Sequence, residues 1–208
     1  MSAYSLPPLT DLERDALAEL SNMAMARAAL SLRQMVQHEV VLSVPSVEIL
    51  TRQGALQLVT KKEHVKLVAI RQDFSGVLSG RALLIFPEAG SLELVRIVVG
   101  RQLPIEDIVD LEDEALAETG NIILNSWVAT IANLLKHSLK MSLPVVLRGE
   151  NQDIFDAQSA GENLVLFLHI RFEVSDRQIN GYVALLMDLP TLDGFRSLIA
   201  DYIAQTTR

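Results

Sequence analysis

The sequence predicts an α/β fold of the α+β type, in which two similar helix–strands–helix units share one largely antiparallel sheet and each contributes a long helix. Three observations predict it. Part of the first half recurs in the second half, strand-like runs follow one another instead of alternating singly with helices, and each half opens and closes with a helical pattern. We expect one domain over residues 1–208, made of two repeats at about 10–100 and 107–206 and related by a pseudo-twofold axis.

The two copies match best in their opening segments, residues 15–50 and 114–150. The run "ALAE" occurs in both, and three pairs of residues are each separated by 99 positions: Glu19 and Glu118, Asn22 and Asn121, Pro45 and Pro144. Residues 79–100 and 180–200 also match, since each contains a glycine, an apolar run, a proline and a helical pattern. We interpret the chain as a duplication of a unit of about 100 residues, with a hinge near residues 100–107.

The elements are expected in the same order in each unit. The first helix has a start signal in Thr10 and Glu13, which have capping-box spacing, and Asp110 is expected to cap the second. Proline-containing strands follow at 39–50 and 140–148, and proline favours an edge or bulged position. Further strands are expected at 54–60, 65–74, 82–86, 163–174 and 181–188. Shorter helices at 88–99 and 190–205 close the units.

The composition excludes several classes of protein. Half of the 208 residues are hydrophobic and 21% are charged, which is typical of a globular chain. A formal net charge of −8 argues against a nucleic-acid partner. The absence of cysteine excludes disulfides, thiolate zinc sites and cysteine nucleophiles. The opening residues lack the basic start and apolar core that a secretory signal requires, and no apolar run has bilayer length, so we expect a cytoplasmic protein without a membrane partner.

A polar stripe on each opening helix is the candidate functional site. Residues at steps of four and three share one face of a helix. The first stripe contains Asp15, Glu19, Asn22 and Ala26, and the second contains Glu114, Glu118, Asn121 and Asn125. One such stripe is ordinarily a solvated helix face. Because the outward-facing Glu and Asn recur as well as the core positions do, we favour a functional role for both stripes.

A glutamate beside an asparagine suits phosphoryl transfer better than metal binding. The four histidines, His38, His64, His137 and His169, are scattered and none has ligand spacing on a stripe. The amide of asparagine both donates and accepts hydrogen bonds, so it can orient a water without repelling an anion. A carboxylate can bind a cation on a partner. Phosphoryl transfer needs mainly such positioning and charge stabilisation.

The pattern Asp/Ser-x3-Glu-x2-Asn, followed by a proline about 22 residues later and present twice, resembles the CheC-type phosphatases of bacterial chemotaxis. That family includes CheC, CheX and the middle part of FliY, and the two-site CheC arrangement is the closest to this chain. The resemblance implies a substrate, the phosphoaspartate of a CheY-like response-regulator receiver domain. It also implies that Asn22 and Asn121 place a water for in-line attack, while Glu19 and Glu118 bind the receiver's active-site lysine.

The same resemblance implies that the receiver holds the Mg²⁺ ion, so no cofactor of the chain's own is expected. Asp15, Glu114, Ala26 and Asn125 are expected to contact the partner. The deamidase CheD is a further partner that the resemblance allows. Two non-catalytic alternatives stay open: a CheC-like adaptor that binds or sequesters a response regulator, and a structural dimerisation module whose two stripes would be buried.

Three departures from the family pattern concern the sites. Glu114 stands where the family has Asp or Ser, and the surroundings of the two asparagines contain one glycine, Gly120. Asn125 and Trp127 are bulky beside the second stripe, whereas Ala26 leaves the first open. We therefore expect two sites, of which the first is sterically freer. Pro45 and Pro144 are interpreted as structural residues that place the strand after each helix.

Overall fold

The order of elements along the chain is nearly the same in its two halves. The computed structural model describes residues 8–62, 66–99, 105–149, 154–155, 164–174 and 177–206. The first half contains α1 (Asp11–Val36), β1 (Val40–Thr51), α2 (Arg52–Lys62), β2 (Leu67–Ser75), β3 (Gly80–Pro87) and α3 (Glu88–Val99). The second half contains α4 (Ile105–Leu135), β4 (Lys140–Met141), β5 (Val145–Gly149), β6 (Leu164–Val174), β7 (Arg177–Met187) and α6 (Leu189–Thr206).

All seven strands belong to one sheet, and every pair is antiparallel. The order across the sheet is β1-β6-β7-β3-β2-β4, and β5 also pairs with β2 at the β4 edge. The α/β fold with a largely antiparallel sheet is therefore confirmed. The strand order is symmetrical about the contact between β3 and β7. On one side β7 and β6 are followed by β1 of the other half, and on the other side β3 and β2 are followed by β4 and β5 of the other half. The duplication and the two repeat boundaries stay a prediction.

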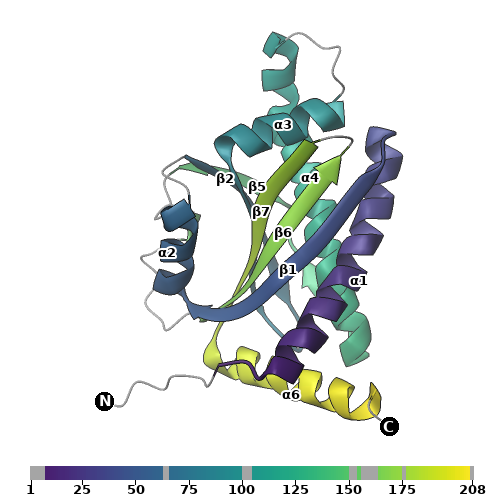
Figure 1. Cartoon of the computed structure of the whole chain (residues 1–208), viewed down its shortest axis with the longest axis vertical. Helices are drawn as coiled ribbons and strands as arrows, with labels where there is room; N and C mark the ends of the chain where they lie inside the picture. Colours follow the sequence, from purple (N-terminus) through teal and green to yellow (C-terminus); the bar gives the residue numbers. More distant parts are fainter. Residues whose placement is uncertain are drawn as a thin grey trace.

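The helices form layers on the two faces of the sheet. The long helices α1 and α4 run antiparallel to each other on one face, with α3 and α6 near their ends, and α2 lies apart from this group (Figure 1). The core between the long helices and the sheet contains Leu17, Met25 and Leu116, each at most 1% exposed. The smaller core on the other face includes Val59 and Phe155. Each fully buried side chain of this size contributes about 1.5–3 kcal/mol.

The capping box at the start of α1 is confirmed. The main-chain nitrogen of Glu13 donates to the Thr10 hydroxyl at 3.2 Å, and the Thr10 nitrogen donates to the Glu13 carboxylate at 2.8 Å. The predicted cap at Asp110 is wrong, because α4 begins five residues earlier, at Ile105. Asp110 therefore lies inside a helix. Of the predicted hinge, residues 105–107 belong to α4 and 100–104 lie outside the described residues.

The predicted strand at 54–60 is a helix, α2. Its start is marked by Thr51, whose hydroxyl accepts a hydrogen bond from the main-chain nitrogen of Gly54 at 3.1 Å. Ala55 and Val59 are four residues apart and both fully buried, so the apolar run follows a helical period. The sequence of this short run is also compatible with a strand. It forms a helix because its apolar residues are buried against the far face of the sheet.

The motif prolines lie in β-bulges at opposite edges of the sheet. Ser43 pairs with Arg171 and Ser46 with His169, so residues 44–45 oppose one residue of β6. The predicted strand at 140–148 is split into β4 and β5, and residues 142–144 oppose two residues of β2. Each bulge thus adds one residue. The expectation that proline occupies an edge or bulged position is confirmed for Pro45.

No helix in the described part of the chain is both long and apolar enough to cross a membrane.

Candidate functional site

Both predicted stripes lie on the outer faces of α1 and α4. Six of their eight residues are exposed: Asp15, Glu19, Asn22, Ala26, Glu114 and Glu118. Asn121 and Asn125 are half-buried. The stripes are therefore exposed in the single chain, whereas the dimerisation alternative expected both of them to be buried.

The motif carboxylates are free to bind a cation. Neither Glu19 nor Glu118 forms an ion pair or hydrogen bond with another described residue. The structural carboxylates of the same helices differ: Glu13 is paired with Arg196 at 2.9 Å, and Glu112 with Arg148 at 3.1 Å. A free surface carboxylate on a rigid helix is well suited to a charge-assisted hydrogen bond with a lysine.

The amide of Asn22 is fixed by the bulge in β1. Its Oδ1 accepts from the main-chain nitrogen of Val44 at 2.9 Å. Its Nδ2 donates to the carbonyl oxygen of Ala18 at 2.9 Å and lies 3.5 Å from that of Val44. Asn22 and Pro45 are 23 positions apart because the residue before the proline turns its main chain toward the helix. The spacing of the motif thus has a structural basis.

The amide of Asn121 is fixed differently, by side chains. Its Oδ1 accepts from Gln72 Nε2 at 3.1 Å and also from Asn125 Nδ2. Gln72 Nε2 donates in addition to the carbonyl oxygen of Ser142, at 2.9 Å, in the second bulge. Asn121 therefore contacts its bulge through Gln72 rather than directly.

Gln72 is the site residue that sequence reasoning missed. It is 1% exposed, and its Oε1 has no hydrogen-bond partner. It occupies an inward position of β2, two residues from the apolar Ile70 and Phe74. A polar residue at an inward strand position was the available signal. On the same face, β6 presents only apolar side chains, including Ile170 and Phe172, so the first site has no counterpart to Gln72.

The two helices that carry the stripes are joined by buried polar contacts. Trp127 Nε1 donates to the hydroxyl of Ser21 at 3.1 Å, and an Arg27 guanidinium nitrogen donates to Thr130 at 3.3 Å. Trp127 is 5% exposed and lies between the helices. It does not crowd the second stripe, contrary to the expectation from its size. Asn125 does lie beside Asn121 and bonds to it.

Glu13 connects the start of α1 to α6. Burial alone would raise the pKa of the Glu13 carboxyl, but hydrogen bonds from Arg196 and Thr10, together with the charge of Arg196, outweigh burial and lower this pKa. Both side chains are about 15% exposed. The pair fixes the end of α1 that precedes the first stripe.

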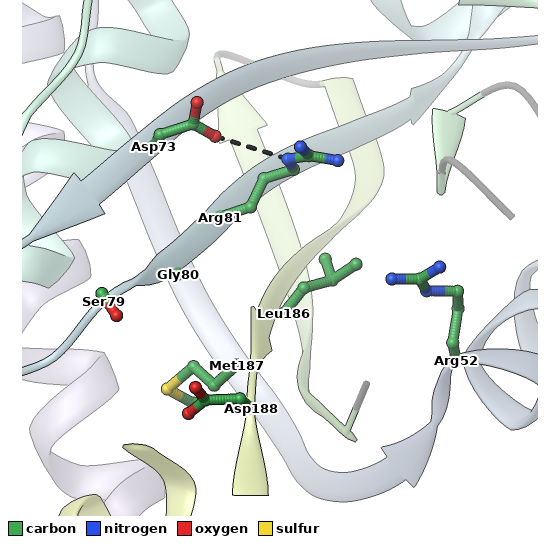
Figure 2. Close-up of a pocket in the computed structure, with 8 residues that line it drawn as sticks. All are labelled: Arg52, Asp73, Ser79, Gly80, Arg81, Leu186, Met187 and Asp188. Atoms are coloured by element: carbon green, nitrogen blue, oxygen red, sulfur yellow. Dashed lines mark hydrogen bonds and ion pairs between the residues drawn. The ribbon is translucent and has the colours of Figure 1, made fainter. Parts of the chain in front are cut away.

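The described residues contain no group of three His, Cys, Asp or Glu side chains placed to hold a metal ion. A pocket of about 290 Å³ lies away from the stripes, at the ends of β3 and β7 (Figure 2). Three of its polar residues have structural partners: Arg81 is bonded to Asp73 at 3.3 Å, and Asp188 accepts from the nitrogen of Thr191 at the start of α6. These hydrogen bonds from Thr191 lower the pKa of Asp188. None of the predicted site residues lines this pocket.

The fold is shared with the solved structures of FliY and of the FliM middle domain. The chain superimposes on FliY of Thermotoga maritima with a TM-score of 0.74 at 17% identity, covering 93% of this chain and 98% of that one. The middle domain of FliM from Helicobacter pylori gives a TM-score of 0.61 at 7% identity, over 91% and 99% of the two chains. Identities this low establish the fold alone.

The sequence likeness is to CheC. The chain is 25% identical over 196 residues to the CheY-P phosphatase CheC of Bacillus subtilis, covering 89% of this chain and 91% of the relative. No family model matches the chain. Together with the fold that it shares with FliY, this likeness shows that the chain is similar to CheC-type proteins.

Proposed function

We propose that this protein is an aspartyl-phosphate phosphatase that acts on the receiver domain of a CheY-like response regulator. The observation that carries the proposal is the pairing, on each long helix, of an unpaired exposed glutamate with an asparagine held by hydrogen bonds one turn later. The relative in Bacillus subtilis is a CheY-P phosphatase, and it matches along nearly the whole chain.

The chemistry divides between the two side chains of each pair. Glu19 and Glu118 bind the ammonium group of the receiver's active-site lysine and so orient the two proteins. Asn22 and Asn121 reach the phosphoryl group, where an asparagine amide can hold a water in line with the bond that breaks. The water oxygen bonds to phosphorus, the bond from phosphorus to the aspartate oxygen breaks, and inorganic phosphate leaves. The Mg²⁺ ion belongs to the receiver.

Positioning of this kind needs a rigid amide. An asparagine that rotated freely would lose conformational entropy when it entered the partner's active site. The hydrogen bonds from Val44 to Asn22 and from Gln72 to Asn121 remove that freedom before the partner binds. Preorganisation of this kind is a general feature of sites that orient water.

A non-catalytic adaptor is the second candidate, because one observation supports docking without requiring catalysis. Leu12, Met23 and Leu30, between 46% and 63% exposed, lie along the outward side of α1 beside the stripe. Exposed apolar residues around a charged stripe suit docking whether or not hydrolysis follows.

The test is the release of phosphate from a CheY-like receiver that has been phosphorylated with acetyl phosphate. We expect the wild-type chain to accelerate release, and the Asn22→Ala, Asn121→Ala double variant to lower the acceleration roughly 100-fold, the scale on which one orienting group acts. Glu19→Gln with Glu118→Gln should raise KM. Ser31→Ala, on α1 outside the stripe, is the matched control and should change neither.

Each alternative has its own outcome. A wild-type chain that binds the phosphorylated receiver but leaves its rate of phosphate loss unchanged is an adaptor. An active chain whose double asparagine variant keeps full activity has its catalytic groups elsewhere.

A further inference from the structure

The two asparagines offer different hydrogen-bonding groups to a partner. The amide of Asn22 has two N–H donors and two acceptor positions on Oδ1. The nitrogen faces the carbonyl oxygens of Ala18 and Val44, and one acceptor position is occupied by the Val44 N–H. One acceptor position remains on an exposed side chain. Asn22 is therefore an acceptor toward the partner.

Asn121 has the opposite character. The carbonyl oxygen of Ser142 fixes the orientation of Gln72, because only the nitrogen of that amide can donate to it. The same nitrogen faces Asn121, so the facing atom of Asn121 is its oxygen. Asn125 donates to that oxygen as well. Both acceptor positions are then filled, and no described residue accepts from Nδ2. Asn121 is therefore a donor toward the partner.

This difference matters for the attack on phosphorus. A water attacks with a lone pair, and an acceptor that takes one of its hydrogens leaves that lone pair free. An N–H donor instead occupies a lone pair of the water. A donor is suited to an oxygen of the phosphoryl group, which carries negative charge.

We infer that hydrolysis takes place at the α1 site, through Asn22, and that Asn125 is the positioning residue that keeps Asn121 from orienting the water, so that the α4 site binds the phosphorylated receiver with little hydrolysis. This inference rests on the phosphatase function proposed above. It assigns different roles to sites that the sequence makes look alike.

The residue that distinguishes the α4 site from the α1 site is Asn125. Asn125 and Ala26 are 99 residues apart and hold the same place in the two stripes. Ala26 has no donor, so the acceptor position of Asn22 stays open. Exchanging the two residues should open an acceptor position on Asn121 and fill the one that is open on Asn22.

The experiment measures kcat and KM for phosphate release from the acetyl-phosphate-treated receiver. Asn22→Ala should lower kcat roughly 100-fold, while Asn121→Ala should change kcat less than about twofold and raise KM. Adding Asn125→Ala to Asn22→Ala should restore kcat at least tenfold, because it frees one acceptor position of Asn121. The triple variant that also carries Asn121→Ala should lose this gain.

The reciprocal variant leaves Asn22 and its bonds to the bulge in place. Ala26→Asn should lower kcat about tenfold or more, by donating to Asn22 Oδ1. Ala26→Leu has a similar volume and no donor, so it should change KM alone. If Asn22→Ala fails to fold, the two variants at position 26 still test the inference.

The outcomes separate the two proposals. If the wild-type chain releases no phosphate, the phosphatase function fails and this inference fails with it. If the wild type is active but Asn22→Ala and Asn121→Ala lower kcat equally, or Asn125→Ala restores nothing, the inference alone is overturned.

Discussion

Gly120 of α4 lies against Ile70 of β2, so closely that a Cβ atom at position 120 would come 2.7 Å from the Cβ of Ile70. Gly120 is the one glycine near the two motif asparagines. The structure assigns it to the inside of the molecule, where it lets the helix approach the sheet. Asn121 follows directly, and this approach brings it within reach of Gln72, two residues along the strand from Ile70.

Gly120→Ala should destabilise the protein. The new methyl group would overlap a β-branched side chain close to its own main chain, and overpacking of this kind costs about 1–3 kcal/mol. The better helix propensity of alanine returns about 1 kcal/mol. The net loss in the free energy of unfolding, measured by urea denaturation, should be up to about 2 kcal/mol. Ile70→Ala should reduce that loss when the two substitutions are combined.

Gly194→Ala in α6 is the matched control. A Cβ at that position would have its nearest neighbour 4.0 Å away, at Leu78. The substitution should therefore raise the free energy of unfolding by about 0.5–1 kcal/mol. A loss of similar size at both glycines would mean that close packing on Ile70 is not the reason for Gly120.

The main-chain N–H of Val44 should become exposed to exchange when Asn22 is replaced by alanine. Val44 is 3% exposed and its N–H donates to Asn22 Oδ1. A buried donor that loses its partner costs about 1–3 kcal/mol, and each 1.4 kcal/mol is a factor of ten in an equilibrium constant. Hydrogen exchange of the Val44 amide, followed by NMR, should be about 5- to 100-fold faster.

Asn121→Ala provides the comparison for this measurement. Its amide accepts only from the side chains of Gln72 and Asn125, so no main-chain N–H depends on it. Exchange at Val44 should stay as in the wild type. Unchanged protection of Val44 in Asn22→Ala would show that the amide of Asn22 is not what holds the bulge.

The paired Glu13 makes stability depend on acid pH. Its pKa is lower in the folded protein than the usual 4.5, so the unfolded chain binds more protons around that pH. The contribution is complete above the unfolded pKa and is lost as the pH falls through the folded pKa. Glu13→Gln should cost about 1–3 kcal/mol at pH 7, and this cost should become smaller as the pH falls below 4.5, measured by denaturation at a series of pH values.

Asp11→Asn tests whether any charge at this helix end has the same effect. The Asp11 side chain is 96% exposed in its pair with Arg14, so its loss should cost less than about 0.5 kcal/mol. Some acid sensitivity should persist in Glu13→Gln, because Asp188 also has a lowered pKa. A slope of stability with pH that is the same in Glu13→Gln and wild type would contradict the assignment.

The sequence predicted what depends on neighbouring residues, and missed what depends on contacts across the fold. The capping box of Thr10 and Glu13 lies within four residues and was found. Arg196, the ion-pair partner of Glu13, is 183 residues away and gives no local signal. Asp110 predicts the start of the second long helix because aspartate is a common capping residue, but α4 begins at Ile105.

The candidate site likewise has features that the sequence predicted and features that it missed. Helical spacing placed Glu19 and Asn22 on one exposed face, because that face follows from the period of the helix. The bond from Asn121 to Gln72 joins residues 49 positions apart, through a sheet order that the sequence alone did not give. The chemical difference between the two asparagines therefore became visible only with the strands in place.

Ser21 should stabilise the protein through Trp127, the only tryptophan in the chain. Its hydroxyl accepts from the indole N–H at 3.1 Å in the buried contact between α1 and α4. Ser21→Ala leaves that N–H without a partner and should lower the free energy of unfolding by about 1–3 kcal/mol, with a change in the emission of Trp127. Ser31→Ala removes an exposed hydroxyl from the same helix and should stay within about 0.5 kcal/mol with unchanged emission. Equal effects of the two substitutions would show that the contact between the helices does not depend on this hydrogen bond.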